Sequence, residues 1–418
     1  MSIPDPTTAA PASGPAAPTL RRGLGLWHAV LYGLGVTIGA GIYVLIGPAA
    51  AKAGMAAPLS FVLAAVLMAL TAASFAELAG RMPVAAGEAA YVAHGLGSER
   101  AGTAIGLLVV AIAITTAAAI SVGSAGYIVA FIDVPRLVVV AAVVLTMGAI
   151  AAWGIVESVT FAGAMTLIEI GGLLLIAALG PAAGPGVVTP PPPLLPPAGD
   201  ADAWRGVMAA GLLAVFAFVG FESIVNIAEE VRAPERTLPR AILLTLLLSA
   251  LLYVGVVWVS LIALAPEELS RTDAPLAAVF TRLSGLDPWP MSAIAIVATL
   301  NGIIVSIIMA SRVLYGLARR GQLPAALGSV HHLTRTPLLG TAATTAIVLA
   351  LALLIPLEGL AELSSRLTLV MFVFVNLSLV LMRRRESAPP EGIYVAPRGV
   401  PLAGVVATGG FLLADLLL

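Results

Sequence analysis

The sequence contains no cysteine, which excludes disulfide bonds, thiolate metal sites and cysteine nucleophiles. Histidine is also rare. The four histidines, His28, His94, His331 and His332, form no metal-binding spacing with a second histidine and a carboxylate. We therefore expect neither a metal centre nor a cofactor.

Charge is scarce as well. The 21 basic and 22 acidic residues make up only 10% of the 418-residue chain, whereas an average soluble domain is roughly 25% charged. The net charge of −1 lacks the basic excess of a nucleic-acid-binding protein. By contrast, 60% of the residues are hydrophobic and the mean hydropathy is +1.06. So few charges cannot cover so much apolar surface in water. This composition excludes a soluble enzyme and a disordered protein, and it predicts an integral membrane protein in a lipid bilayer.

Long apolar runs dominate the chain after residue 22. A membrane core of about 30 Å requires about 20 apolar residues in a helix. On this rule we predict an all-α membrane protein with about eleven spans. The predicted spans are Leu26–Gly47, Pro58–Ala79, Ala101–Phe131, Leu137–Trp153, Val159–Leu179, Trp204–Ala228, Ala241–Ala265, Met291–Leu317, Leu338–Pro356, Leu367–Met382 and Leu402–Leu418.

The distribution of basic residues predicts the orientation, because cytoplasmic loops carry an excess of Lys and Arg. With the N-terminus inside and the spans alternating, fifteen basic residues lie inside and six lie outside. The six outside residues are Lys52, Arg136, Arg205, Arg271, Arg282 and Arg366. We therefore predict a multi-pass protein of the cell inner (plasma) membrane with a cytoplasmic N-terminus.

The first and sixth spans contain glycine at mid-span, where a helix is easily interrupted. The first reads GLGVTIGAGIY at 33–43, and the sixth reads FVGFESI at 218–224. Each Gly costs about 1 kcal/mol relative to Ala in a helix interior. Non-helical backbone in a membrane is tolerated only where protein or a water-filled cavity satisfies its polar groups. Close helix packing through small residues is the alternative interpretation.

The spacing of the two interruptions favours a pair of inverted repeats. Aligning Ile38 with Val219 gives an offset of 181 residues, and each interruption falls in the first helix of a block of five. Because five is odd, the second block enters the membrane from the opposite side, which is typical of a secondary transporter. The predicted units are a disordered cytoplasmic tail (1–22), a first five-helix repeat (23–180), a Pro-rich external linker (181–203), a second five-helix repeat (204–385) and an additional C-terminal transmembrane helix (386–418).

Four motifs follow one another along the chain. They are IGAGIY at 38–43, FAELAGRMP at 75–83 with GEAAY at 87–91, GFES at 220–223 with PER at 234–236 and LPR at 238–240, and SRVLY at 311–315 with ARRGQLP at 318–324. Through them, over residues 23–416, the sequence resembles the amino acid–polyamine–organocation (APC) superfamily of amino-acid permeases. The resemblance implies the leucine-transporter-type 5+5 inverted-repeat fold with discontinuous first and sixth helices. It also implies a small amino acid as the substrate.

The same resemblance implies a substrate site at the two interruptions. The implied residues are Ile38, Gly39, Ala40, Gly41, Phe216, Val219 and Phe221. The substrate carboxylate is expected on the amides of residues 39–41, and the ammonium group on carbonyls near Ile38, Phe216 and Val219. Phe216, Phe218 and Phe221 are expected to wall the side-chain pocket, with ordinary core packing as the alternative.

The sequence departs from the family pattern at the middle of the fifth helix. Some proton-coupled members carry a lysine there, and this sequence has Glu169. A charged side chain at the bilayer centre costs at least about 2.5–3.5 kcal/mol on insertion scales, and a carboxyl group lowers that cost by holding a proton. We predict that Glu169 carries the coupling proton. A neutral structural role and a sodium ligand are the alternatives.

These observations predict a secondary active amino-acid permease that is proton-coupled and works by alternating access, and not an enzyme. An amino-acid exchanger and a sodium-coupled transporter stay open, as does a non-transporting amino-acid sensor with the same fold. A channel requires repeated subunits or charged rings. A membrane enzyme requires a metal cluster or a nucleophile with its base. The sequence shows neither arrangement.

Overall fold

The computed structural model describes residues 23–38, 41–84, 87–153, 159–182, 195–386 and 391–417. These residues fold into helices, and the part of the chain that is described contains no strand beyond one isolated bridge between Leu24 and Val231. The predicted tail at 1–22 and residues 183–194 of the predicted linker lie outside the described residues.

The long helices occupy the eleven predicted spans. They are α1 (Leu26–Ile38) with α2 (Gly41–Ala53), α3 (Ala57–Arg81), α5 (Glu99–Val129), α6 (Arg136–Trp153), α7 (Val159–Ala182), α8 (Ala201–Phe218) with η2 (Phe221–Glu230), α9 (Pro234–Ala263), α12 (Trp289–Arg319), α13 (Leu338–Leu354), α14 (Leu357–Arg385) and α15 (Val400–Leu417). The short helices between them are η1 (Gly54–Ala56), α4 (Gly87–Leu96), α10 (Pro266–Arg271), α11 (Pro275–Ser284) and η3 (Ala325–Gly328).

The length and apolar composition of the helices indicate a multi-pass membrane protein. Among the described residues, nine stretches are long and apolar enough to cross a membrane, and one of them runs from Gly41 to Arg81 through α2, η1 and α3. Helices α1 and α13 are shorter and equally apolar. A helix satisfies its own backbone polar groups, which hydrocarbon cannot do. The prediction of an all-α membrane fold is therefore confirmed.

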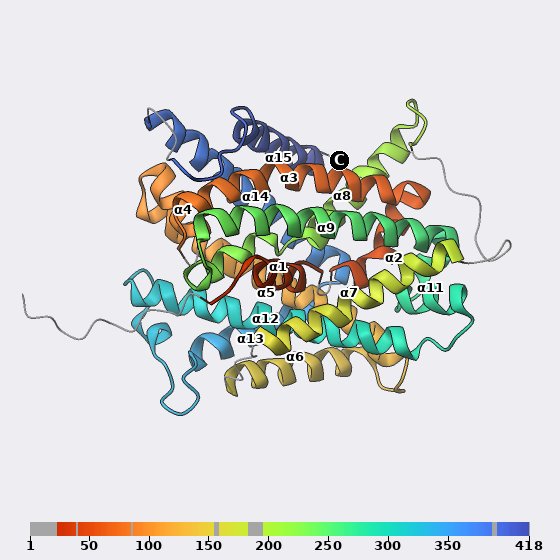
Figure 1. Cartoon of the computed structure of the whole chain (residues 1–418). Coiled ribbons are helices and arrows are strands. Elements are labelled where there is room, and N and C mark those ends of the chain that lie inside the picture. Colours follow the sequence, from red (N-terminus) through yellow and green to blue (C-terminus); the bar gives the residue numbers. More distant parts are fainter. Residues whose placement is uncertain are drawn as a thin grey trace, which may run out of the picture.

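The outer helices present apolar side chains outward. Helix α15 buries only Pro401, Gly404 and Thr408 among its described residues, while Leu402 and Val406 stay more than half exposed. Helices α15 and α6 lie at opposite edges of the bundle in Figure 1, with α1 near its centre. Helix α1 packs against α9 and α7, and α2 packs against α8. The two interrupted helices therefore lie inside the bundle.

The bundle has two differently charged ends. The arginine-rich side carries Arg81, Arg319 and Arg383 at the last turns of α3, α12 and α14. On this side the N–H of Leu24 donates to the carbonyl of Glu230 at 3.0 Å, and the N–H of Arg232 donates to the carbonyl of Leu24 at 2.9 Å. These bonds tie the chain entering α1 to the end of η2. The opposite side carries Lys52 at the last turn of α2.

Candidate functional site at two interrupted helices

The first interruption lies between α1, which ends at buried Ile38, and α2, which begins at buried Gly41. Gly39 and Ala40, which were predicted to offer amides to the substrate, lie outside the described residues. The last carbonyls of α1 and the first N–H groups of α2 have no partner within their own helices. Together they form a pair of opposed helix ends inside the bundle.

The second interruption lies between α8, which ends at Phe218, and η2, which begins at Phe221. Gly220 has a φ of +136°, a conformation that side chains with a Cβ rarely adopt. Its N–H donates to Oε2 of Glu222 at 2.9 Å, and the N–H of Val219 donates to the carbonyl of Phe216 at 3.2 Å. The Glu222 carboxylate therefore binds a backbone N–H group of the interruption in which it lies.

The two interruptions are in direct contact. A Cβ at Gly41 would lie 2.7 Å from Cα of Ala217, and a Cβ at Gly220 would lie 2.8 Å from Cα and N of Thr37. Real Cβ atoms essentially never come that close to another heavy atom. Each interruption therefore packs a glycine against the backbone of the other helix, which explains why these two positions have no side chain.

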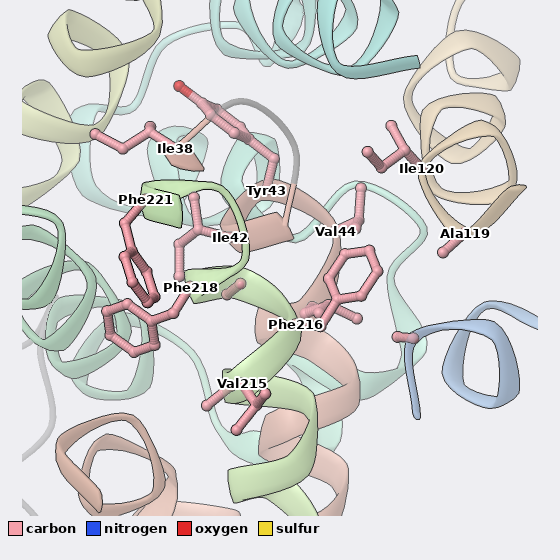
Figure 2. Packing of buried hydrophobic residues seen from close by; sticks show 14 of the residues in the cluster. Ile38, Ile42, Tyr43, Val44, Ala119, Ile120, Val215, Phe216, Phe218 and Phe221 are labelled. Atoms are coloured by element: carbon pink, nitrogen blue, oxygen red, sulfur yellow. The ribbon is translucent and has the colours of Figure 1, made fainter. Parts of the chain in front are cut away.

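The predicted phenylalanines fall into two groups, as Figure 2 shows. Phe216 lies beside Val44, and its Cδ1 would be 3.4 Å from a Cβ at Gly41. Phe221 instead packs its ring against Phe75 and Phe372, with centroids 6.0 and 5.7 Å away. Phe216 thus stays next to the first interruption, while Phe221 belongs to an aromatic cluster.

Two buried tyrosines donate hydrogen bonds to main-chain carbonyls around the site. The Tyr253 hydroxyl lies 2.7 Å from the carbonyl oxygen of Thr37 and 3.0 Å from that of Ala217. The Tyr127 hydroxyl donates to the carbonyl of Tyr43 at 2.6 Å. Tyr253 and Tyr127 were not predicted as site residues, because a tyrosine in an apolar span indicates only that its hydroxyl needs some acceptor.

Glu169 lies fully buried on α7. Its Oε1 accepts a hydrogen bond from Nδ2 of Asn301 on α12 at 3.3 Å. Its main-chain carbonyl accepts one from the Tyr43 hydroxyl at 2.7 Å. Because Tyr43 is the third residue of α2, this second bond connects Glu169 to the helix that starts at the first interruption.

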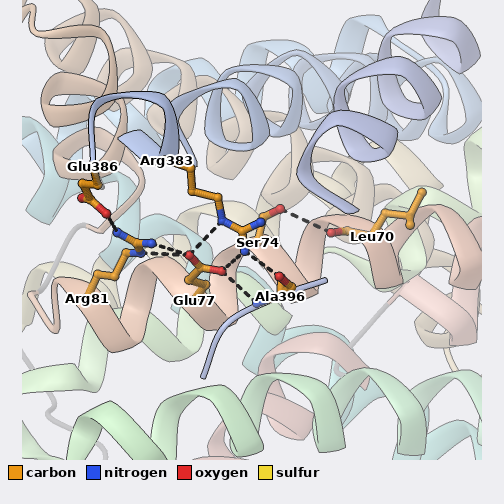
Figure 3. Close-up of polar contacts among 7 residues, drawn as sticks. All are labelled: Leu70, Ser74, Glu77, Arg81, Arg383, Glu386 and Ala396. Carbon is orange, nitrogen blue, oxygen red and sulfur yellow. Dashed lines mark hydrogen bonds and ion pairs between the residues drawn. The ribbon is translucent and has the colours of Figure 1, made fainter. Parts of the chain in front are cut away.

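A buried ion-pair network closes the arginine-rich side (Figure 3). The fully buried Glu77 carboxylate accepts from Nη2 of Arg81 at 2.6 Å, from Nε of Arg383 at 3.1 Å and from the N–H of Ala396 at 2.8 Å. Arg81 also pairs with Glu386. This network joins the end of α3 to the end of α14 and to the segment before α15.

A second carboxyl group on this side is Glu88, in the first turn of α4. Burial raises the pKa of Glu88 to about 7, and the negative charge of Glu222 contributes to the rise. The protonated form of Glu88 therefore persists at a pH where an exposed glutamate is fully ionised.

The opposite side carries a partly exposed ion-pair network around a cavity of about 370 Å³. Lys52 at the end of α2 pairs with Glu362 on α14 at 3.0 Å, and Arg366 on α14 pairs with Asp415 on α15 at 2.7 Å. Helix α14 is thus held by ion pairs near both of its ends. Among the described residues, no group of three or more His, Cys, Asp or Glu is placed to hold a metal ion.

The sequence is similar to known membrane transport proteins. A family model described as "Amino acid permease" matches residues 24–416. An uncharacterized transporter of Mycobacterium tuberculosis is 33% identical over 391 residues, which cover 93% of this chain and 84% of that protein. A branched-chain amino acid permease of Bacillus subtilis is 29% identical over 92% of this chain and 85% of its own length. The vacuolar cationic amino acid transporter 2 of Arabidopsis thaliana is 30% identical over 89% of this chain and 61% of its own length.

Proposed function

Because the chain belongs to the amino acid permease family, we propose that it is a secondary active transporter that moves a small amino acid across the membrane by alternating access. The contact between the two interrupted helices is the observation that carries this proposal. It brings together, inside the bundle, helix-terminal N–H and carbonyl groups that have no partner within their own helices. These groups suit the carboxylate and the ammonium group that every amino acid shares.

We further propose a neutral substrate with an apolar side chain. Apolar side chains lie close to the interruptions, including Ile38, Val44 and Phe216. Two buried carboxylates nearby are already engaged, because Glu222 accepts from Gly220 and Glu169 accepts from Asn301. A cationic side chain would therefore have to compete for each of them. The relative named as a branched-chain permease supports this substrate class, and the relative named as a cationic transporter supports the alternative.

A thermal-shift screen with purified protein tests this substrate class. A ligand that binds the folded state raises the unfolding midpoint by mass action. We expect leucine, isoleucine or valine to raise it and arginine and lysine to leave it unchanged. The opposite pattern contradicts the neutral class. Concentrative uptake in proteoliposomes then separates a transporter from a sensor, which binds the same ligand without moving it.

We propose that protons drive transport and that Glu169 carries the coupling. Its main-chain bond to Tyr43 and its side-chain bond to Asn301 connect the first interrupted helix with α12. Protonation of a buried carboxyl removes its charge and adds one O–H donor to a group that otherwise only accepts hydrogen bonds. This change alters the bonds between the two helices, so that proton binding favours one of the two access states.

The variant Glu169→Gln tests the coupling, because glutamine resembles the protonated acid and does not titrate. We expect it to retain substrate binding and substrate exchange, and to lose uphill uptake driven by an imposed pH gradient. Glu88→Gln is the matched control. It also removes a buried carboxyl group, yet one on α4 at the arginine-rich side. We expect it to keep pH-driven uptake.

Two results would overturn the proton proposal. One is uphill uptake by Glu169→Gln at the wild-type rate. The other is wild-type uptake that follows a sodium gradient and ignores pH, which assigns Glu169 and Asn301 to a sodium site. Exchange without net uptake under any gradient would make the protein an amino-acid exchanger.

We also propose that the arginine-rich side faces the cytoplasm of the cell and that the protein lies in the inner (plasma) membrane. In the predicted topology, fifteen basic residues lie on this side and six on the other. The positive-inside bias supports this orientation.

A further inference from the structure

The hydroxyl of Tyr253 occupies equivalent positions relative to both interrupted helices. Its two acceptors are the carbonyl oxygens of Thr37 and Ala217, at 2.7 and 3.0 Å. Thr37 is the penultimate residue of α1, which ends at Ile38. Ala217 is the penultimate residue of α8, which ends at Phe218. A single side chain on α9 therefore contacts the C-terminal ends of both helices.

These two carbonyls need an external donor. The last four carbonyls of an α-helix have no partner within the helix, and they carry the negative end of its dipole. Water normally satisfies them at a protein surface. Thr37 and Ala217 are buried inside the bundle, where an unsatisfied carbonyl destabilises the fold by several times the thermal energy. The Tyr253 hydroxyl supplies the missing donor.

A hydroxyl group has one proton, so the two carbonyls share it. The proton is directed to Thr37, to Ala217 or between them, and in each case the oxygen stays within hydrogen-bond distance of both. A small shift of one helix relative to the other therefore moves the proton and does not leave both carbonyls unsatisfied. Such sharing keeps the two helix ends together while allowing limited movement.

The ring of Tyr253 is held independently of its hydroxyl. It packs against Phe218 with ring centroids 5.1 Å apart and against Phe61 with centroids 6.3 Å apart. The side chain is fully buried. Replacement by phenylalanine therefore removes the hydrogen bond and leaves the packing in place.

We propose that Tyr253 is a positioning residue that ties the C-terminal ends of α1 and α8 together, so that both interruptions keep one common geometry. The proposal rests on the proposed function only in assigning substrate binding to that geometry. The tie itself follows from the two hydrogen bonds and from the close approach of Gly220 to Thr37.

Hydrogen–deuterium exchange of three tyrosine-to-phenylalanine variants tests the tie without any substrate. We expect Tyr253→Phe to speed exchange in both segments, at residues 38–45 and 219–226. Tyr127→Phe removes a bond to the carbonyl of Tyr43 and none to the second interruption, and should speed exchange in the first segment only. Tyr91→Phe removes a buried hydroxyl that has no hydrogen-bond partner among the described residues, and should change neither segment. Exchange in α6, at the edge of the bundle, serves as the internal reference for intact folding.

Substrate affinity gives the second measurement. Loss of the common geometry should raise the dissociation constant of the transported amino acid roughly tenfold, which is the effect of losing about one net hydrogen bond. Tyr91→Phe should bind as wild type does. Unchanged exchange in Tyr253→Phe, or faster exchange in only one segment, overturns the tie. If the wild-type protein neither binds nor transports any amino acid, the proposed function fails, and the exchange experiment still decides the role of Tyr253.

Discussion

Single residues decide whether the two interrupted helices can touch. Gly41 and Gly220 each lie where an added Cβ would come within 3 Å of backbone atoms of the other helix. Backbone atoms cannot move aside as the end of a flexible side chain can. These two glycines therefore serve helix contact as well as local backbone freedom.

At this scale we predict that Gly41→Val inserts into the membrane and loses substrate binding. Its Cβ would meet Cα of Ala217 at 2.7 Å, and its branched side chain stiffens the start of α2. The matched control is Gly171→Val on α7, where the added Cβ would meet no atom within 4 Å. Binding is measured by the thermal shift with the transported amino acid. Wild-type affinity in well-folded Gly41→Val would show that the site is elsewhere.

The buried Glu88 carboxyl predicts how the stability of the folded protein depends on pH. Burial raises its pKa from 4.5 to about 7, so the folded state holds this proton more tightly than the unfolded state. Its contribution to the free energy of unfolding is therefore fully present below pH 4.5 and is lost as the pH rises to about 7, at about 1.4 kcal/mol per pH unit. We expect the unfolding midpoint of Glu88→Gln to fall less between pH 5 and pH 7.5 than that of wild type.

The control for that measurement is Glu99→Gln, because Glu99 is exposed at the start of α5. It should show the wild-type pH dependence. Equal slopes for Glu88→Gln and wild type would mean that Glu88 ionises in the folded protein as freely as in the unfolded chain.

At the scale of elements, α14 is held near both ends by ion pairs of different kinds. Near its end, Arg383 contacts Glu77, whose side chain is 0% exposed. Near its start, Glu362 pairs with Lys52, and their side chains are 21% and 31% exposed. Removing Arg383 takes away hydrogen bonds from the buried Glu77 carboxylate, which keeps Arg81 as its counter-ion. The partners of an exposed pair are readily solvated instead.

We therefore predict that Arg383→Ala lowers the free energy of unfolding by about 1.5–3 kcal/mol. Lys52→Ala should lower it by at most about 1 kcal/mol. Denaturant or thermal unfolding in detergent measures both variants. Equal losses would indicate that solvent reaches Glu77 as easily as it reaches Glu362.

Elements with a long apolar run were predictable from the sequence, and shorter ones were not. The eleven spans were predicted because each is a long, mostly apolar stretch. Helices α10 and α11, over Pro266–Arg271 and Pro275–Ser284, were missed because they are too short to give such a signal. The interruptions were predicted from their glycines, since glycine at mid-span is costly in a continuous helix.

The partners across the bundle were not predictable in the same way. Tyr253 and Thr37 are 216 residues apart, and Glu169 and Asn301 are 132 residues apart. One sequence indicates that a buried hydroxyl or carboxyl needs a partner, yet it does not say which helix supplies it. The predicted site residues Gly39 and Ala40 lie outside the described residues, so their role stays a prediction.

At the scale of the whole molecule, the charge difference between the two ends predicts the orientation in the cell. Leu195 and Leu333 are 61% and 77% exposed, in the linker before α8 and in the loop between η3 and α13. The chain has no cysteine of its own. We expect Leu195→Cys to react with an impermeant maleimide added to intact cells, and Leu333→Cys to react only after the membrane is permeabilised. The reverse pattern would invert the proposed topology.

The Glu77 network also determines an order of events during synthesis. Arg81 lies four residues after Glu77, whereas Arg383 lies 306 residues after it. At about 5–20 residues per second, a ribosome needs roughly 15–60 s to produce the second partner. Throughout that interval, Arg81 is the counter-ion available to Glu77 on the nascent α3. Arg81 is therefore the partner that matters while the protein is being made, and Arg383 completes the network in the finished molecule.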